Sequence, residues 1–102
     1  MGLSIKLETE DGEPLEFVID PRNLLHKLLP DADDTSSVCL RFIDWYGDTT
    51  FNYLQMEAFI VEWDGLYRSD LSSEETELLD NVRELAVRCR EGRHAYLKFY
   101  GD

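Results

Sequence analysis

A two-residue alternation of apolar and polar side chains constrains the fold of this chain more than any other feature of its sequence. Residues 3–7, 15–19 and 95–100 all show this pattern. Because side chains along a strand point alternately to the two faces of a sheet, each segment predicts a strand with one buried and one wet face. An Asp-Gly pair within residues 10–14 favours a tight turn. We therefore expect a β-hairpin over residues 3–19 and a final strand near the C-terminus.

A further strand is predicted in the middle of the chain. Residues 38–43 alternate in the same way, with Val38, Leu40 and Phe42 on one face. After a turn, residues 49–51 would add a short returning strand paired with this one. The sheet is therefore expected to have four or five strands.

Capping residues and apolar spacing predict two helices in the first two thirds of the chain. Asp20-Pro21 is typical of a helix start, and Pro30 ends the short helix that follows. Residues 53–67 form a second helix, with Asn52 and Gln55 as a capping box. Because this helix has few polar positions, we expect it to be buried on most sides and to be the central one.

A third helix follows Ser72, which precedes two acidic residues in the first turn. Its apolar face includes Leu78, Val82 and Leu85, and Gly92 stands where a helix-terminating glycine belongs. This pattern is typical of an amphipathic helix lying on a sheet.

The elements follow one another in the order ββαβ(β)ααβ. Each long strand has one apolar face, which favours an antiparallel sheet covered on one side, whereas parallel strands are apolar on both faces. The predicted fold is a single α+β domain over residues 1–102: an antiparallel four- to five-stranded sheet with three helices packed on one face.

The composition restricts the kind of partner. Acidic residues outnumber basic ones 22 to 10, so the formal net charge is −12. Nucleic acids and anionic membranes are bound by clustered Lys and Arg, so neither is an expected partner. The sequence contains neither a long apolar run nor a secretory signal at its start, so we expect a cytoplasmic protein. A basic protein is the partner that this charge favours.

The wet face of the predicted sheet is the first candidate site. Its members are Lys6, Glu8, Val18, Arg41, Ile43, Trp45, His94, Tyr96, Lys98 and Tyr100. Among them, Arg41, Trp45, Tyr96, Lys98 and Tyr100 are the candidate contact residues, since Trp, Tyr and Arg are frequent at binding hot spots. The alternative is that cross-strand pairs simply stabilise an exposed sheet. An uncovered sheet face or an edge strand, such as the final one, could also form a homodimer; otherwise the chain is a monomer.

The loop from Asp44 to Asn52 is the second candidate site. Asp44, Gly47, Asp48 and Asn52 lie between a predicted strand and a helix N-terminus. The two acids could hold a divalent cation or a small ligand. The alternative is turn chemistry, in which these side chains bond to nearby backbone groups.

No catalytic residue, metal centre or cofactor site is predicted. The run from Asp31 to Asp34 lacks the Gly and Glu that a calcium loop needs at its sixth and twelfth positions. Cys89 belongs to an apolar helix face, where a thiol is inert, so pairing with His94 as a nucleophile and base is disfavoured. Cys39 and Cys89 are expected to be reduced.

Two resemblances accompany these inferences. Leu40-Arg41-Phe42-Ile43-Asp44, with Gly47-Asp48-Thr49, Phe51-Asn52 and Gln55 after it, resembles small acidic bacterial proteins of unknown function, as does the ending Tyr96-Leu97-Lys98-Phe99-Tyr100-Gly101-Asp102. That resemblance implies no activity. In size and acidity alone, the chain is similar to immunity proteins and antitoxins that neutralise basic toxins. We therefore expect a non-enzymatic interaction module for a basic protein; ligand or cation binding at the Asp44–Asn52 loop is the alternative.

Overall fold

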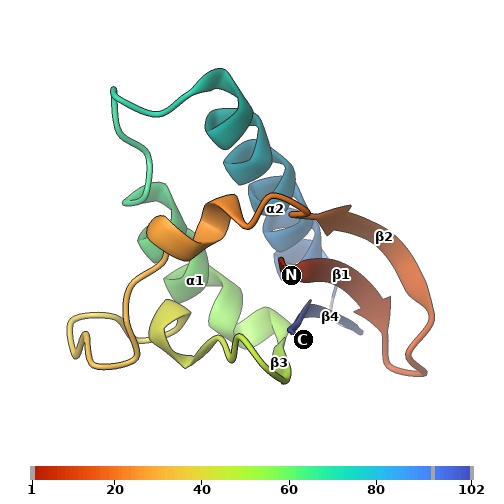
Figure 1. Ribbon diagram of the computed structural model, residues 1–102. Helices are drawn as coiled ribbons and strands as arrows, with labels where there is room; N and C mark the ends of the chain where they lie inside the picture. Colours follow the sequence, from red (N-terminus) through yellow and green to blue (C-terminus); the bar gives the residue numbers. More distant parts are fainter. Residues whose placement is uncertain (1, 93, 102) are drawn as a thin grey trace.

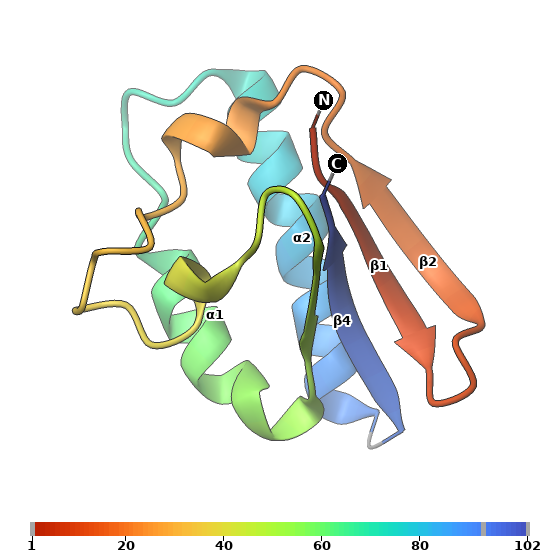
Figure 2. The same cartoon turned by 60° about the horizontal axis from the view of Figure 1, so that its bottom comes forward.

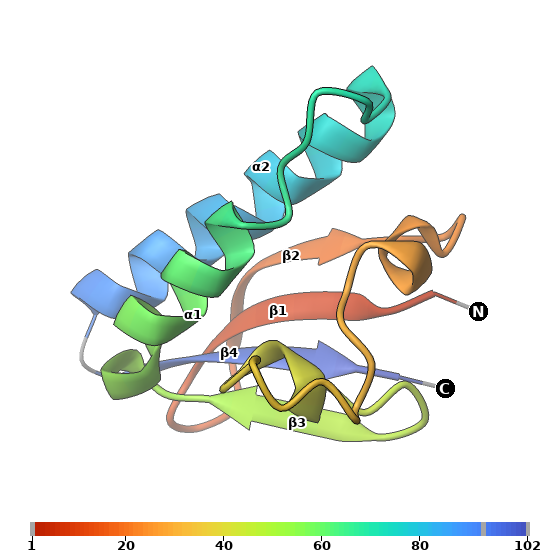
Figure 3. The same cartoon turned by 90° about the vertical axis from the view of Figure 1, so that its left-hand side faces the viewer.

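The fold is an α+β arrangement, seen in a computed structural model that describes residues 2–92 and 94–101. The strands are β1 (Ser4–Thr9), β2 (Pro14–Ile19), β3 (Asp48–Phe51) and β4 (Ala95–Tyr100); the α-helices are α1 (Met56–Asp64) and α2 (Ser73–Glu91); the 3-10 turns are η1 (Leu24–Lys27), η2 (Leu40–Phe42) and η3 (Tyr53–Gln55). The four strands form one open sheet in the order β2-β1-β4-β3, and all neighbours are antiparallel. Both α-helices lie on the same side of the sheet (Figures 1 and 3). The side away from them is called the open face below.

The predicted hairpin is confirmed, but the orientation predicted for β2 is wrong. Ile5 pairs with Val18, so Val18 lies on the helix side and packs against the core. Lys6 pairs with Phe17, which places Phe17 on the open face. The register shifts between Leu7 and Glu8, and this bulge accommodates an extra residue in β2. Since one extra residue inverts the faces of a strand, alternation within β2 could not reveal which set is buried.

The strand predicted over residues 38–43 is wrong. Leu40–Phe42 is the 3-10 turn η2, and the backbone N–H groups of Val38 and Cys39 donate to the carboxylate of Glu62 on α1. Amides bound to a side chain are not available to a β-ladder. The short strand predicted at residues 49–51 is present as β3, but it pairs with β4 rather than with residues 38–43.

The short helix predicted after Asp20 is also reduced to a 3-10 turn. Asn23 has φ of 56°, a left-handed conformation that interrupts any α-helix begun at Pro21. The Asp20 carboxylate accepts hydrogen bonds from the amides of Leu24 and Leu25. The described chain therefore has two α-helices rather than three, and β4 is an inner strand rather than an edge.

The predicted capping residues are used, but the helix predicted over residues 53–67 is shorter: it begins as the 3-10 turn η3, and α1 covers only Met56–Asp64. Asn52 and Gln55 exchange side-chain and backbone hydrogen bonds before α1, and Ser72 and Glu75 do the same before α2. The helix α2 packs on β1, β2, β4 and α1, so it takes the central position that was predicted for α1. Within the core, the indole of Trp63 on α1 donates to the Leu79 carbonyl on α2 at 3.0 Å.

Candidate functional site

The predicted contact residues of β4 form one cluster on the open face. Tyr96, Lys98 and Tyr100 alternate along β4, opposite Glu8 and Lys6 of β1. Glu8 is only 4% exposed, and its carboxylate accepts a hydrogen bond from the Tyr100 hydroxyl and lies 3.2 Å from the Lys98 ammonium. The Lys6 ammonium lies 5.2 Å from the centre of the Tyr100 ring. The polar groups of this cluster are therefore already bound to one another.

The pKa values in this cluster follow from its contacts. Burial disfavours the charged form of Glu8, but the hydrogen bonds from Tyr100 and Lys98 outweigh it and hold the pKa of Glu8 below its usual 4.5. Burial, together with the bond to Glu8, raises the pKa of Tyr100 to about 12. Glu8 therefore remains an anion at neutral pH and Tyr100 remains neutral, which is the combination that their hydrogen bond requires.

The remaining predicted contact residues lie elsewhere. Arg41 belongs to η2, and its guanidinium donates to the Ala32 carbonyl at 3.0 Å. The Trp45 side chain packs against the core, with its ring 5.4 Å from that of His26. Residues 38–43 are not a strand, so Arg41 is not part of the sheet, whereas the Trp45 backbone lies against Gly101 just after β4. Ile43, also expected on the wet face, is buried, and His94 precedes β4 in a turn.

Apolar side chains that the prediction had assigned to the core are exposed along β2. Phe17 is 65% and Ile19 is 55% exposed, and Leu15 is close to half exposed. The strand β2 is an edge strand, and Figure 2 shows no described segment beside its outer edge. Its only charged residue, Glu16, forms an ion pair with Arg88 of α2. This exposed edge is called the β2 edge below.

A second group of exposed apolar side chains lies on α1 and the turns beside it. Leu54 in η3 is 73% and Val61 in α1 is 71% exposed, and Val38 and Phe42 are each more than half exposed. These four side chains define the α1–η2 surface. In Figure 1 this part of the molecule lies to the left and the β2 edge to the right. The prediction that α1 is buried on most sides is therefore wrong.

The Glu62 carboxylate fixes η2 against α1. It accepts hydrogen bonds from the Ser37 hydroxyl at 2.5 Å and from the amides of Val38, Cys39 and Leu40 at 3.0, 2.7 and 3.3 Å. A carboxylate suits this position because the N-terminus of a turn presents unpaired N–H groups. Val38 and the turn that carries Phe42 are thus tied to the helix that carries Val61.

The α1–η2 surface belongs to a strongly acidic segment of the chain. Residues 31–64 contain eight acidic side chains and one basic one, Arg41. Asp31, Asp33 and Asp34 are exposed in the loop before η2, and Glu57 is exposed on α1. Apolar and acidic side chains are therefore interspersed on this side of the molecule.

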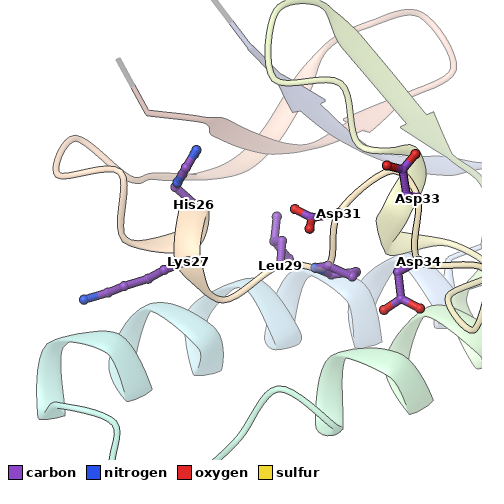
Figure 4. Close-up of a pocket in the computed structure, with 7 residues that line it drawn as sticks. His26, Lys27, Leu29, Asp31, Asp33 and Asp34 are labelled. Atoms are coloured by element: carbon purple, nitrogen blue, oxygen red, sulfur yellow. The ribbon is translucent and has the colours of Figure 1, made fainter.

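Two hollows border the acidic loop. One, of about 750 Å³, is lined by His26, Lys27, Leu29, Pro30, Asp31, Asp33 and Asp34. Figure 4 shows that its charged groups do not converge, since Asp33 and Asp34 point in opposite directions and Lys27 points away from both. The other, of about 410 Å³, lies between this loop and α1, with Leu28, Leu40 and Leu66 beside Asp34 and Glu62. The second hollow combines an apolar lining with two carboxylates.

The side chains of the Asp44–Asn52 loop are engaged in local hydrogen bonds. The Asp44 carboxylate accepts from the Tyr46 amide at 2.9 Å, and the Thr49 hydroxyl accepts from the Asp44 amide at 2.8 Å. Asn52 caps the following turn. An added Cβ at Gly47 would lie 2.8 Å from a carboxylate oxygen of Asp44, so that side chain would have to move. The described residues contain no cluster of three or more potential metal ligands, at this loop or elsewhere.

The two cysteines are free and buried, as predicted. Burial raises the pKa of the Cys89 thiol to about 11. Burial and the Glu62 carboxylate also raise the pKa of Cys39. At neutral pH both are thiols rather than thiolates, and a thiol is a poor nucleophile.

Neither helix of the described chain combines the length and the apolar character that a bilayer crossing requires. Comparisons with protein families, with curated proteins and with solved structures find no match to this chain.

Proposed function

We propose that this protein is a non-enzymatic binding module that docks a basic protein on its α1–η2 surface. The observation that carries the proposal is the coincidence of exposed apolar side chains with a segment, residues 31–64, that holds eight acidic residues and one basic residue. Apolar side chains that leave water on binding supply affinity, and surrounding charge steers a partner of opposite sign. A partner with Lys or Arg around an apolar centre matches both properties.

The surface is held in a fixed form before any partner arrives. The four hydrogen bonds to Glu62 attach η2 to α1, and the ion pair between Asp64 and Arg83 attaches α1 to α2 at 2.6 Å. A surface that is already ordered loses little conformational entropy on binding. This favours association without a large rearrangement.

The hollow between the acidic loop and α1 offers a place for one basic side chain. The stem of a Lys or Arg would lie against Leu40 and Leu66, with its charged end near Asp34 and Glu62. Such an anchor at the border of an apolar surface resembles the hot spots of known interfaces.

The open face, which the sequence favoured, suits a basic partner less well. Lys6 and Lys98 offset Glu8, and the Glu8 carboxylate is occupied by Tyr100 and Lys98. A basic partner would meet two cations there and a carboxylate already paired with Lys98, whereas the groups that bond to Glu62 are uncharged. We therefore assign the proposed docking to the α1–η2 surface.

A synthetic amphipathic helix of Leu and Lys serves as the probe, because it combines apolar and basic side chains. Calorimetric titration should detect binding to the wild-type protein and about tenfold weaker binding to Val61→Gln, which removes apolar area without changing charge. Phe17→Gln is the matched control, since Phe17 is equally exposed on the β2 edge. Equal weakening by both variants, or undetectable binding to the wild type, would refute the proposal.

A further inference from the structure

We infer that the β2 edge pairs with the β2 edge of a second copy of this chain, forming an antiparallel dimer with a continuous eight-stranded sheet. The inference concerns a different surface from the proposed function and does not depend on it. It starts from the position of β2 at the end of the sheet order β2-β1-β4-β3. An edge strand leaves a row of backbone N–H and C=O groups free to bond to another strand.

The described structure of β2 lacks the features that usually protect an edge. Charged side chains, an interior proline and a covering segment are the common protections. Here the single charge, Glu16, is paired with Arg88, and Pro14 stands at the first position of the strand. The bulge lies at the beginning of β2, so residues 16–19 remain in regular register with β1.

The sequence of β2 is self-complementary in one antiparallel register. With Phe17 opposite Phe17 of the second copy, Leu15 lies opposite Ile19, and Ile19 opposite Leu15. All three pairs are apolar, with Phe17 and Ile19 in the regular part of β2 and Leu15 at its bulge, and cross-strand apolar and aromatic pairs stabilise a sheet. A shift by one residue would pair Phe17 with a residue whose side chain lies on the helix side of its own sheet. The register with Phe17 opposite Phe17 is therefore preferred.

The charges within the strands beside this edge balance, so they do not oppose a second copy. Although the chain carries −12, the strands β1, β2 and β4 contain only Lys6, Lys98, Glu8 and Glu16, which sum to zero. The turn before β2 adds Glu10, Asp11 and Glu13, and Asp20 follows the strand, so these acidic side chains lie beyond the ends of the paired segment rather than within it. The acidic loop lies on the opposite side of a molecule 37 × 27 × 24 Å in extent. Even the shortest of these extents exceeds the Debye length of about 8 Å at physiological ionic strength, so repulsion between the acidic loops of the two copies is screened.

Sedimentation equilibrium of the full chain tests the inference. Pairing through one strand buries little area, so the dimer should be weak, and the mass should double only between about 10 μM and 1 mM protein. Phe17→Lys should raise the dimer dissociation constant at least tenfold, even though it lowers the net negative charge. Leu54→Lys makes the same charge change on the α1–η2 surface and should leave the dimer intact. A monomeric wild type over this whole range, or equal effects of the two variants, would overturn the inference.

Hydrogen exchange locates the contact without any substitution. Amides in residues 14–19 should exchange more slowly at high protein concentration than at low concentration, and amides in residues 54–64 should not change. Protection confined to α1 would show that a dimer uses the other surface, and the inference would be wrong.

Discussion

The α1–η2 surface and the β2 edge both expose large apolar side chains, but their electrostatic surroundings differ. Val38, Phe42, Leu54 and Val61 lie in a segment with eight acidic residues and one basic residue. Phe17 and Ile19 lie on β2, and the strands β1, β2 and β4 together carry equal numbers of Lys and Glu. Exposed apolar area gives both surfaces a reason to be covered. Their expected partners differ, because the acidic surroundings of the first favour a basic protein, whereas the self-complementary sequence of β2 favours an identical copy.

The two surfaces also differ in how they are held. The α1–η2 surface depends on the carboxylate of one residue, Glu62, whereas the β2 edge depends on the ladder between β1 and β2. A change at Glu62 should therefore disturb one surface and spare the other. The predictions below use this independence.

The largest effect is expected for Glu62→Gln. An amide offers only one acceptor oxygen to the four donors that now bond the carboxylate, and hydrogen bonds to a charged group contribute about 1.5–3 kcal/mol. We expect a loss of about 2 kcal/mol in the free energy of unfolding and weaker binding of the Leu/Lys helix, with no change in dimerisation. Urea denaturation measures the first. Glu57→Gln, on the exposed side of α1, is the control and should cost little; equal losses in both variants would contradict the role given to Glu62.

Salt should weaken the binding of the Leu/Lys helix but should not weaken dimerisation. Between about 50 and 500 mM salt, the association rate of the Leu/Lys helix should fall about tenfold, because attraction between opposite charges is screened. Dimerisation through the β2 edge should stay constant or strengthen, because the same salt screens repulsion between two chains of −12. Stopped-flow fluorescence and sedimentation measure the two quantities. Parallel weakening of both would show that the surfaces are not electrostatically distinct.

A smaller effect is expected for Tyr100→Phe on the open face. Removing the hydroxyl leaves the buried Glu8 carboxylate with Lys98 alone and should cost about 1 kcal/mol. Tyr96→Phe is the matched control, since no hydrogen bond of the Tyr96 hydroxyl is found within residues 2–92 and 94–101. Neither change should affect the Leu/Lys helix, which binds on the other side. A Tyr96→Phe variant as destabilised as Tyr100→Phe would exclude the hydrogen bond to Glu8 as the cause.

The pH dependence of stability gives a second measurement on the same pair. Because the pKa of folded Glu8 is below its ordinary 4.5, the stability it contributes is present above that value and is lost as pH falls through the folded pKa. In Tyr100→Phe the folded pKa should lie closer to 4.5, so the decline below pH 4.5 should be shallower than in the wild type. Identical acid profiles for the two proteins would contradict this coupling.

The smallest effect is expected from divalent cations. The Asp44 carboxylate and the Thr49 hydroxyl already accept backbone hydrogen bonds, and an ion that bound the folded state would raise its stability. We expect Ca²⁺ or Mg²⁺ in millimolar excess to leave the melting temperature unchanged. A rise that disappears in Asp44→Asn would restore the cation-binding alternative for the Asp44–Asn52 loop.

Local signals in the sequence predicted the elements whose structure is set by nearby residues. The hairpin, β4, the capping box at Asn52 and the whole of α2 are confirmed, because alternation and capping act within a few residues. The predicted strand at residues 38–43 is wrong because its amides bond to Glu62, more than 20 residues away in the chain. Alternation alone cannot detect such a distant acceptor.

The candidate sites were harder to predict than the elements. The faces of β2 depend on a bulge opposite β1, which the sequence of β2 does not encode in any simple pattern. The exposed side of α1 could have been predicted from the sequence. Its buried residues form one helical stripe, made of Met56, Phe59, Ile60 and Trp63, and Val61 lies outside that stripe. The prediction of burial on most sides rested on the number of polar residues in the helix. It did not consider where those residues lie around the helix axis.

The most direct test of the two-surface account is an NMR titration of isotope-labelled protein with the Leu/Lys helix, performed at a concentration where the chain is monomeric. The account predicts that amide shifts concentrate at residues 38–42 and 54–62 and leave residues 14–19 unchanged. Shifts spread evenly over all acidic segments, or concentrated on β2, would contradict it.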